Sequence, residues 1–308
     1  MNFFQPTTWD EALQARAQTP GLLPIAGGTD LMVEFNFDHR RPAPLMDMTR
    51  LEDAGRWWRE GERIRLGAAV PYTRVLSELG RDLPGLAIAS RTVGSPQIRN
   101  RGTVGGNLGA ASPAGDSAPT LIATRAEVEI RGVDGTRHVP VADFFTGVKR
   151  NCVASDELIV AIWVPTDTGP QQYSKIGTRN AMVISVASVA LTLHPRAGRV
   201  GIGMGSVGPT PLQAVAAEEF LAGTLDEGGY WHSRAELPES LVAEFGRQVA
   251  GCTAPIDDVR STAGYRRSAV GVMARRTLSW AWSEYRHGDR RPTGCRAGRD
   301  GEGMTTCE

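Results

Sequence analysis

Residues 99–116 read Arg-Asn-Arg-Gly-Thr-Val-Gly-Gly-Asn-Leu-Gly-Ala-Ala-Ser-Pro-Ala-Gly-Asp, and this stretch decides how the rest of the chain is interpreted. The adjacent glycines Gly105 and Gly106 lack Cβ atoms and tolerate positive φ, so we predict a loop whose backbone N–H groups approach a ligand directly. Thr103 and Asn107 flank the pair with a hydroxyl and an amide that can both donate hydrogen bonds. A loop of this kind holds a phosphate or the polar edge of a ring without a charged side chain.

Asp116 follows Asn107 after a Pro-Ala-Gly turn. Two roles suit its carboxylate. It caps a helix that begins near Pro119 and runs to Ala123, or it accepts a hydrogen bond from a sugar hydroxyl.

A second glycine pair, Gly27-Gly28, follows the apolar, strand-length run 22–26 and precedes a predicted helix start at Leu31. At such a junction the unpaired N–H groups and the helix dipole point the same way, which favours an anion. Two such segments suggest a ligand with two phosphates. A single glycine pair is also typical of a tight turn, so the spacing alone indicates only a phosphate-bearing ligand.

Both segments resemble the flavin loops of the FAD-binding subunit of the molybdenum hydroxylases, the xanthine dehydrogenase and carbon monoxide dehydrogenase family. Residues 26–30 (Ala-Gly-Gly-Thr-Asp) are similar to the first loop. Residues 96–107 (Pro-Gln-Ile-Arg-Asn-Arg-Gly-Thr-Val-Gly-Gly-Asn) match the second nearly letter for letter, and residues 112–116 (Ser-Pro-Ala-Gly-Asp) continue the match. The resemblance runs from about Phe3 to about Leu278.

The resemblance implies an α+β chain with two domains. Residues 1–168 would form an FAD-binding domain of the vanillyl-alcohol oxidase or PCMH type, in which two α/β subdomains clasp the flavin. Residues 169–286 would form an antiparallel sheet with helices, like the C-terminal domain of CO dehydrogenase flavoproteins. The polar, turn-rich stretch 166–170 marks the predicted boundary. Residues 287–308 lack apolar periodicity, so we expect a disordered tail.

The local pattern predicts several elements directly. Thr8 and Glu11 have the spacing of a capping box, and Asp134-Gly135 predicts a hairpin. Pro211 is expected to open a helix that ends at Gly223.

Cofactor contacts are implied by the resemblance, residue by residue. The backbone of residues 25–30 would hold the diphosphate, and residues 103–107 would complete the phosphate and ring contacts. Asp116 would take a ribose or ribityl hydroxyl. Lys175, in a Lys-x-Gly-x-Arg stretch, would reach the ring, where its charge stabilises the anion formed on reduction. A surface ion pair is the alternative for Lys175.

Val93 and Ile159 would contact the adenine side or the ring side of the cofactor. We predict neither a catalytic residue nor a metal ligand in this chain. The predicted cofactor-binding residues are Leu23, Pro24, Ile25, Ala26, Gly27, Gly28, Thr29, Asp30, Val93, Thr103, Val104, Gly105, Gly106, Asn107, Asp116, Ile159 and Lys175.

The implied function is electron transfer within a heterotrimer. A large partner subunit with molybdopterin would hydroxylate the substrate, and a small partner with [2Fe–2S] clusters would pass electrons to FAD in this chain. NAD⁺ or another acceptor would receive them. We expect noncovalent FAD, because Thr29-Asp30 stands where some flavoproteins of the wider fold carry a tethering His, and no Cys is nearby.

Two alternatives remain open. One is a stand-alone flavin oxidoreductase similar to enolpyruvyl-glucosamine reductase, which needs a dedicated acid for which the sequence offers no convincing candidate. The other is a non-catalytic binding or assembly protein whose glycine pairs are only turns.

Composition narrows the class of protein. Lys plus Arg equals Asp plus Glu, 34 each, so no basic excess favours nucleic acid or a membrane surface. No apolar run reaches the roughly 20 residues of a spanning helix, and the N-terminus lacks a signal peptide, so we expect a cytoplasmic protein. The cysteines are too scattered for a zinc or iron–sulfur site: Cys152, Cys252, Cys295 and Cys307.

Residues 203–208 spell G-x-G-x-x-G, the pattern of dinucleotide-binding turns. That interpretation needs a helix directly afterwards, and Pro209-Thr210-Pro211 follows instead. We therefore predict glycines of a sheet that passes close to another stretch of backbone.

Overall fold

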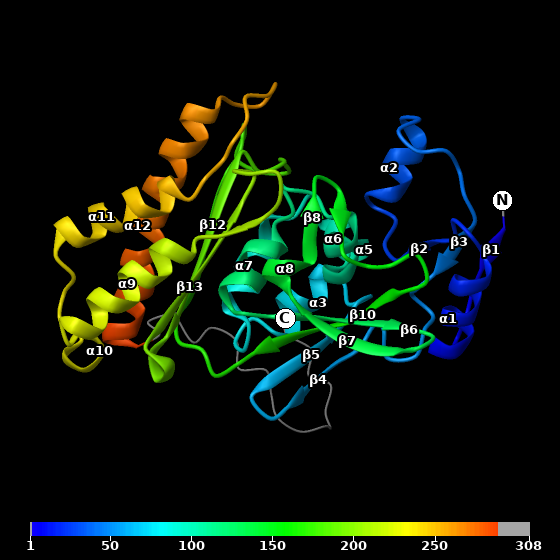
Figure 1. Cartoon of the computed structure of the whole chain (residues 1–308), viewed down its shortest axis with the longest axis horizontal. Helices are drawn as coiled ribbons and strands as arrows, with labels where there is room; N and C mark the ends of the chain where they lie inside the picture. The colour runs from blue at the N-terminus through cyan, green and yellow to red at the C-terminus, as the bar shows by residue number, and fades with distance from the viewer. Residues whose placement is uncertain (1, 289–308) are drawn as a thin grey trace, which may run out of the picture.

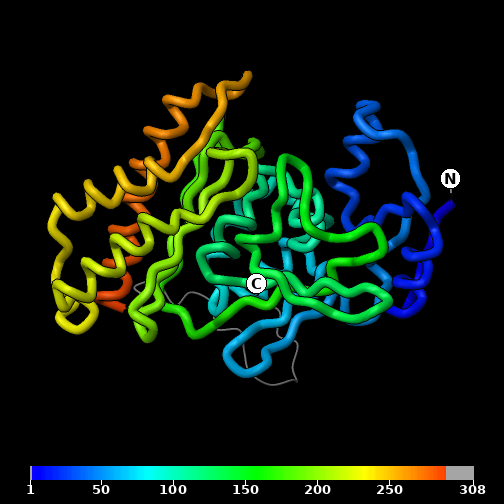
Figure 2. The backbone as a smooth tube through the Cα atoms, viewed as in Figure 1, coloured from blue at the N-terminus to red at the C-terminus, as the bar shows by residue number. Residues whose placement is uncertain are grey.

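The structure, a computed structural model, describes residues 2–288, and three groups of elements follow one another along its longest axis (Figure 1). The N-terminal segment lies at one end of the molecule and the long C-terminal helices at the other (Figure 2). Nearly all of the predicted tail, residues 287–308, lies outside the described residues, as do Cys295 and Cys307.

The N-terminal group is a small parallel sheet with two helices. Its elements are β1 (Phe3–Phe4), α1 (Trp9–Gln18), β2 (Leu23–Ile25), α2 (Leu31–Asn36) and β3 (Leu45–Asp47). The strand order is β1-β3-β2. The predicted capping box is confirmed, because the Thr8 side chain accepts from the Glu11 N–H and the Glu11 carboxylate accepts from the Thr8 N–H. Ala12 and Leu13 then bury one face of α1 against the sheet.

An antiparallel sheet supports the middle group. Its strands are β4 (Trp57–Glu60), β5 (Arg63–Gly67), β6 (Glu127–Gly132), β7 (Gly135–Pro140) and β10 (Leu158–Pro165). They lie in the order β4-β5-β10-β6-β7. The hairpin predicted at Asp134-Gly135 is confirmed by the pairing of Gly132 with Gly135. Ile64, Val128 and Ile162 are fully buried, so this sheet forms one wall of the central core.

Short helices and a two-stranded hairpin cover this sheet. They are α3 (Tyr72–Glu78), α4 (Pro84–Thr92), α5 (Pro96–Arg101), α6 (Val104–Ala110), α7 (Ser117–Ala123), α8 (Val141–Phe144), β8 (Phe145–Gly147) and β9 (Arg150–Asn151). The loop predicted at residues 103–107 is wrong. Thr103 caps α6, and the glycine pair lies in the first turn of that helix.

A second antiparallel sheet and a layer of helices form the C-terminal group. The elements are β11 (Gln171–Ile176), β12 (Ala187–His194), the 3₁₀ turn η1 (Pro195–Ala197), β13 (Arg199–Gly205), β14 (Leu212–Gln213), α9 (Val215–Glu227), α10 (Tyr230–Ser233), α11 (Glu239–Gly251) and α12 (Ala263–His287). Every residue of β12 is buried, because α12 packs against the sheet on one side and α7 on the other (Figure 1). The helix predicted from Pro211 is wrong at its start, since residues 212–213 pair with β13 as an edge strand.

The G-x-G-x-x-G stretch begins within β13, as the sheet interpretation predicts. A Cβ on Gly203 would lie 2.0 Å from the Pro119 carbonyl oxygen, and one on Gly201 would lie 1.9 Å from that of Ala123. Only glycine therefore lets β13 approach α7 so closely, and the prediction of close backbone packing is confirmed.

Within residues 2–288, no helix is both long and apolar enough to cross a membrane. The same residues bring no three His, Cys, Asp or Glu side chains together as a metal site requires.

Candidate functional site

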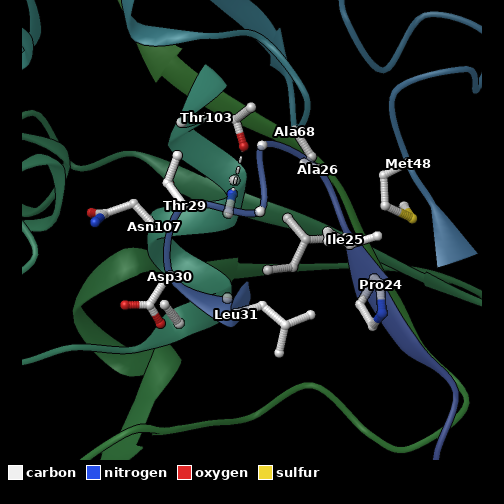
Figure 3. Close-up of a pocket in the computed structure, with 18 of the residues that line it drawn as sticks. Pro24, Ile25, Ala26, Thr29, Asp30, Leu31, Met48, Ala68, Thr103 and Asn107 are labelled. Carbon is white, nitrogen blue, oxygen red and sulfur yellow. Dashed lines mark hydrogen bonds between the residues drawn. The ribbon is translucent and has the colours of Figure 1, made fainter. Parts of the chain in front are cut away.

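Both glycine pairs line a single cavity of about 430 Å³ between the N-terminal and middle groups (Figure 3). The two segments touch. A Cβ on Gly27 would lie 1.9 Å from the Arg101 carbonyl oxygen, and Thr29 Oγ1 would lie 3.3 Å from a Cβ on Gly102. Glycine at position 27 is thus required for the two stretches to meet, and their meeting creates the cavity.

The first segment leaves a row of backbone donors without partners. Gly28 has φ +71°, and the chain turns there from β2 into α2. Among the described residues, the N–H groups of Gly27, Gly28, Thr29 and Asp30 donate to no acceptor. All of these residues line the cavity. Successive unpaired N–H groups in such a turn attract an anion without a basic side chain.

The second segment adds a helix face of small residues. Thr103 Oγ1 accepts from the Gly106 N–H at 2.9 Å, the bond drawn in Figure 3. Gly106 and Gly109 are exposed to the cavity, whereas Gly105 is buried. A Cβ on Gly105 would lie 2.5 Å from the Ala68 carbonyl oxygen, so the twin glycines do different things. Gly105 packs α6 onto the end of β5, and Gly106 leaves the cavity open.

Asn107 lies on the same turn of α6 and points toward the cavity (Figure 3). Its Oδ1 accepts from Ser117 Oγ at 2.5 Å, which fixes the amide. Its Nδ2 donates to no acceptor among residues 2–288. The side chain therefore offers the cavity an oriented donor.

Ile159 and Val93 both contribute apolar side chains to the wall. Ile159 precedes a bulge in β10, the central strand of its sheet, where the pairing with β6 shifts register between Ile159 and Ala161, and such a shift re-aims side chains. Val93 ends α4. Both line the cavity, together with the predicted residues of the first segment, Leu23, Pro24, Ile25 and Ala26.

Val104, Asp116 and Lys175 are not part of that lining. Val104 is fully buried in the central core. Asp116 occupies the N-cap position of α7, but its side chain makes no capping bond, so the capping interpretation is wrong.

Asp116 instead forms a buried cluster with β11. Lys175 Nζ lies 2.6 Å from Asp116 Oδ2, and the Tyr173 hydroxyl donates to Asp116 Oδ1 at 3.0 Å. Burial raises the pKa of the Asp116 carboxyl, and Lys175 and Tyr173 oppose that rise. The ion pair is therefore internal rather than on the surface. Cofactor contacts for Asp116 and Lys175 stay predictions.

A cluster of charges at the cavity wall escaped the sequence interpretation. Lys149, in the β8–β9 turn, lies 2.8 Å from Glu34 and 3.3 Å from Asp30. Arg40 holds the other oxygen of Glu34 at 2.9 Å. Lys149 has φ +55° and follows Asp30 by 119 residues, so no local spacing signals the contact. The β8–β9 turn thereby connects both glycine segments, because the Lys149 N–H donates to the Ala111 carbonyl at the end of α6.

Two family models match successive parts of the chain. The family described as "FAD binding domain in molybdopterin dehydrogenase" matches residues 1–167, and "CO dehydrogenase flavoprotein C-terminal domain" matches residues 172–281. The first match covers more than half of the chain.

Similar proteins carry consistent names. The nicotinate dehydrogenase FAD-subunit of Eubacterium barkeri is 32% identical, over 72% of this chain and 79% of that protein. The nicotine 6-hydroxylase medium subunit of Paenarthrobacter nicotinovorans is 28% identical, over 82% and 87% respectively.

A solved structure shares the whole fold. Carbon monoxide dehydrogenase from Hydrogenophaga pseudoflava, in a form that lacks the Mo-pyranopterin moiety of the molybdenum cofactor, superposes with a TM-score of 0.83. The two chains are 27% identical over 92% of this chain and 97% of that one. The predicted fold class is confirmed, and the chain belongs to the FAD-binding subunits of the molybdenum hydroxylases, the oxidoreductase family that includes xanthine and carbon monoxide dehydrogenases.

Proposed function

We propose that this subunit holds FAD noncovalently in the cavity and relays electrons from [2Fe–2S] clusters of a small partner subunit to NAD⁺ or another acceptor. A large partner subunit with molybdopterin would oxidise the substrate. The observation that carries the proposal is the meeting of both glycine segments in one cavity, with unpaired backbone donors at residues 27–30. The medium-subunit name of a relative supports membership of a multi-subunit assembly.

The residues present fit the cofactor. A diphosphate carries negative charge and many acceptor oxygens, which match the unpaired N–H groups and the Asn107 amide. The cavity volume of about 430 Å³ lies within the usual range for cofactor sites. When bound, FAD supplies the exchange between one-electron and two-electron transfer that such a relay requires.

The orientation follows from the neighbours of the cavity. Val93 lies at the C-terminal end of α4, and Lys175 Nζ lies 3.3 Å from the carbonyl of the adjacent Thr92. The Val93 end of the cavity thus adjoins the β11 cluster, where Asp116 and Tyr173 hold the lysine in place. We assign the flavin ring to this end, with Lys175 as the nearby positive charge, and the adenosine to the opposite end.

Noncovalent attachment has a simple test. Residues 29–30 are Thr-Asp and contain neither His nor Cys for a flavin tether, so trichloroacetic acid should release the yellow chromophore into the supernatant. Colour that stays with the precipitate contradicts noncovalent binding.

The relay itself is tested by reconstitution. The chain purified with FAD should oxidise neither purines nor aldehydes alone, and the complex assembled with both partner subunits should reduce NAD⁺ or a dye acceptor. Omission of this chain from the assembly should leave substrate oxidation at the partner measurable but stop electron delivery to NAD⁺. Reduction of an enolpyruvyl-sugar nucleotide by the isolated chain with NADPH would instead favour a stand-alone reductase.

A further inference from the structure

One cation that lines the cavity has no hydrogen-bond or ion-pair partner in the described part of the chain. Arg16, Arg40 and Lys149 are the basic side chains in the described lining. Arg40 and Lys149 are held by Glu34, whereas Arg16 makes no ion pair and no hydrogen bond within residues 2–288. Its Nε is buried without an acceptor. A desolvated donor that lacks a partner costs free energy, so its persistence beside a cavity calls for a ligand.

Nearby carboxylates do not satisfy Arg16. Glu157 also lines the cavity, but it pairs with Arg137, which donates to both of its oxygens at 2.7 Å, and it makes no bond to Arg16. Asp156 makes no hydrogen bond or ion pair with Arg16 and affects it only through the charge of its carboxylate. Burial lowers the pKa of the Arg16 guanidinium, and the charge of Asp156 partly offsets that effect. The group remains a cation, and its buried Nε has no acceptor among residues 2–288.

The place of Arg16 in the fold identifies which part of the ligand it meets. Arg16 lies in the last turn of α1. This helix belongs to the N-terminal group at one end of the molecule, and β11 lies far from it along the longest axis (Figure 1). Met48, Ala54 and Leu158 line the cavity beside it and belong to the apolar cluster beneath α1. Arg16 therefore lines the cavity together with apolar side chains of this cluster.

An adenine ring suits such a pocket. Its faces are apolar and its ring nitrogens accept hydrogen bonds, whereas a guanidinium only donates. The flavin end of the cofactor is already assigned to the Val93 side, beside Lys175. The remaining end of an extended FAD is the adenosine.

We propose that Arg16 binds the adenine end of FAD, where its guanidinium donates to ring nitrogens of the purine and thereby favours FAD over FMN. This inference rests on the proposed function, because it presupposes that the cavity holds FAD. It adds a specificity residue on α1 that neither glycine segment contains.

The experiment compares Arg16→Met with Arg81→Met, a matched change of an exposed arginine outside the cavity. Apoprotein is titrated with FAD, with FMN and with ADP, by quenching of flavin fluorescence and by calorimetry. We expect Arg16→Met to raise the Kd for FAD and for ADP at least about tenfold, the size of a lost hydrogen bond to a charged group. The Kd for FMN, which lacks the adenosine, should stay within about twofold of the wild-type value in the Arg16→Met protein. Arg81→Met should change none of the three.

Stability separates a binding role from a packing role. Met replaces a half-buried guanidinium whose Nε lacks an acceptor among residues 2–288, so apo Arg16→Met should unfold at the wild-type temperature or above it, while the gain in Tm on adding FAD shrinks. If the Met protein does not fold, Arg16→Gln serves for the same titrations. Unchanged affinity for FAD, or an equal loss for FAD and FMN, overturns the inference. A wild-type chain that binds no FAD at all refutes the proposed function instead.

Discussion

The first turn of α6 and the strand β13 are both rich in glycine, but glycine has a different role in each. At Gly203 and Gly205 of β13, backbone and Ser188 atoms of the neighbouring elements occupy the space that a side chain would need. Gly203 pairs with β12 on one side and β14 on the other, so its polar backbone groups are engaged in the sheet. Gly106, in contrast, faces a cavity, and a Cβ there would meet only Thr103 Oγ1 at 2.9 Å.

The difference shows that glycine spacing by itself does not identify a ligand site. The glycines of G-x-G-x-x-G in β13 pack against α7, while the N–H groups of Gly-Gly at residues 27–28 have no acceptor among the residues that the structure describes. The two regions differ in whether the backbone N–H groups already donate hydrogen bonds within a sheet. A ligand site of this kind needs glycines whose N–H groups have no acceptor in the protein.

The largest effect should come from filling the closed interface. In Gly203→Ala the new Cβ would lie 2.0 Å from the Pro119 carbonyl oxygen, which is backbone and cannot move aside cheaply. We expect the free energy of unfolding to fall by about 3–5 kcal/mol in urea titrations, in the range of severe core changes. Gly223 in α9 is the control, because nothing lies within 4 Å of a Cβ at that exposed position. Gly223→Ala should raise stability by about 0.5–1 kcal/mol. Equal effects of the two changes would show that β13 and α7 are not packed so tightly.

The twin glycines of α6 sharpen the comparison within one turn. Gly105→Val drives a side chain into the Ala68 backbone, so we expect a loss of about 3 kcal/mol of stability. Gly106→Val projects into the cavity instead. Its stability should change by about 1 kcal/mol or less, since only the Thr103 cap is disturbed, and the Kd for FAD should rise about 100-fold, equivalent to about 2.8 kcal/mol. Paired unfolding and flavin-titration measurements separate the two. If Gly106→Val retains stoichiometric FAD with wild-type affinity, the cofactor does not lie against α6.

Much of the fold could be predicted because local chemistry decides it. Three local signals each determine the structure of only a few residues: the capping box at Thr8, the turn at Asp134-Gly135, and the prolines that follow the G-x-G-x-x-G stretch of β13. The glycines of β13 also revealed close packing, since nothing in the following sequence permits a dinucleotide turn. The failure at residues 103–107 is instructive. Two glycines predict a loop because glycine destabilises a helix. Here the Thr103 cap and the packing of Gly105 on Ala68 offset that cost.

The sequence could predict the parts of the candidate site that belong to the two glycine segments and to the family resemblance. Residues 25–30 and most of 103–107 line the cavity, as the motif predicts. Lys149 and Arg16 were missed because their significance depends on partners: Lys149 is paired across 119 residues, and Arg16 has no hydrogen-bond or ion-pair partner among residues 2–288. Neither fact is visible in a single sequence, since ordinary surface arginines and lysines look the same.

The smallest effect concerns a titration at the closed interface. His194 Nε2 lies 3.1 Å from the Ala123 carbonyl oxygen, the atom that a Cβ on Gly201 would strike. Burial lowers the pKa of His194 below 6.5, and the charges of Arg125 and Arg199 act in the same direction, while the Ala123 carbonyl and Asp167 oppose it. The unfolded chain therefore binds a proton at a higher pH than the folded chain does. The stability contributed by neutral His194 is complete above pH 6.5 and is lost as the pH falls toward the lowered value.

His194→Gln keeps a donor for the Ala123 carbonyl and removes the titration. Free energies of unfolding measured in urea at pH 7.5 and pH 5.5 should fall less with pH in His194→Gln than in the wild type, and His39→Gln, at an exposed position, should behave as the wild type. FAD affinity should be equal in all three proteins, because β12 does not line the cavity. An unaltered pH slope in His194→Gln would mean that other groups carry the pH dependence, and that the packing of β13 on α7 tolerates a charge at the buried position of His194.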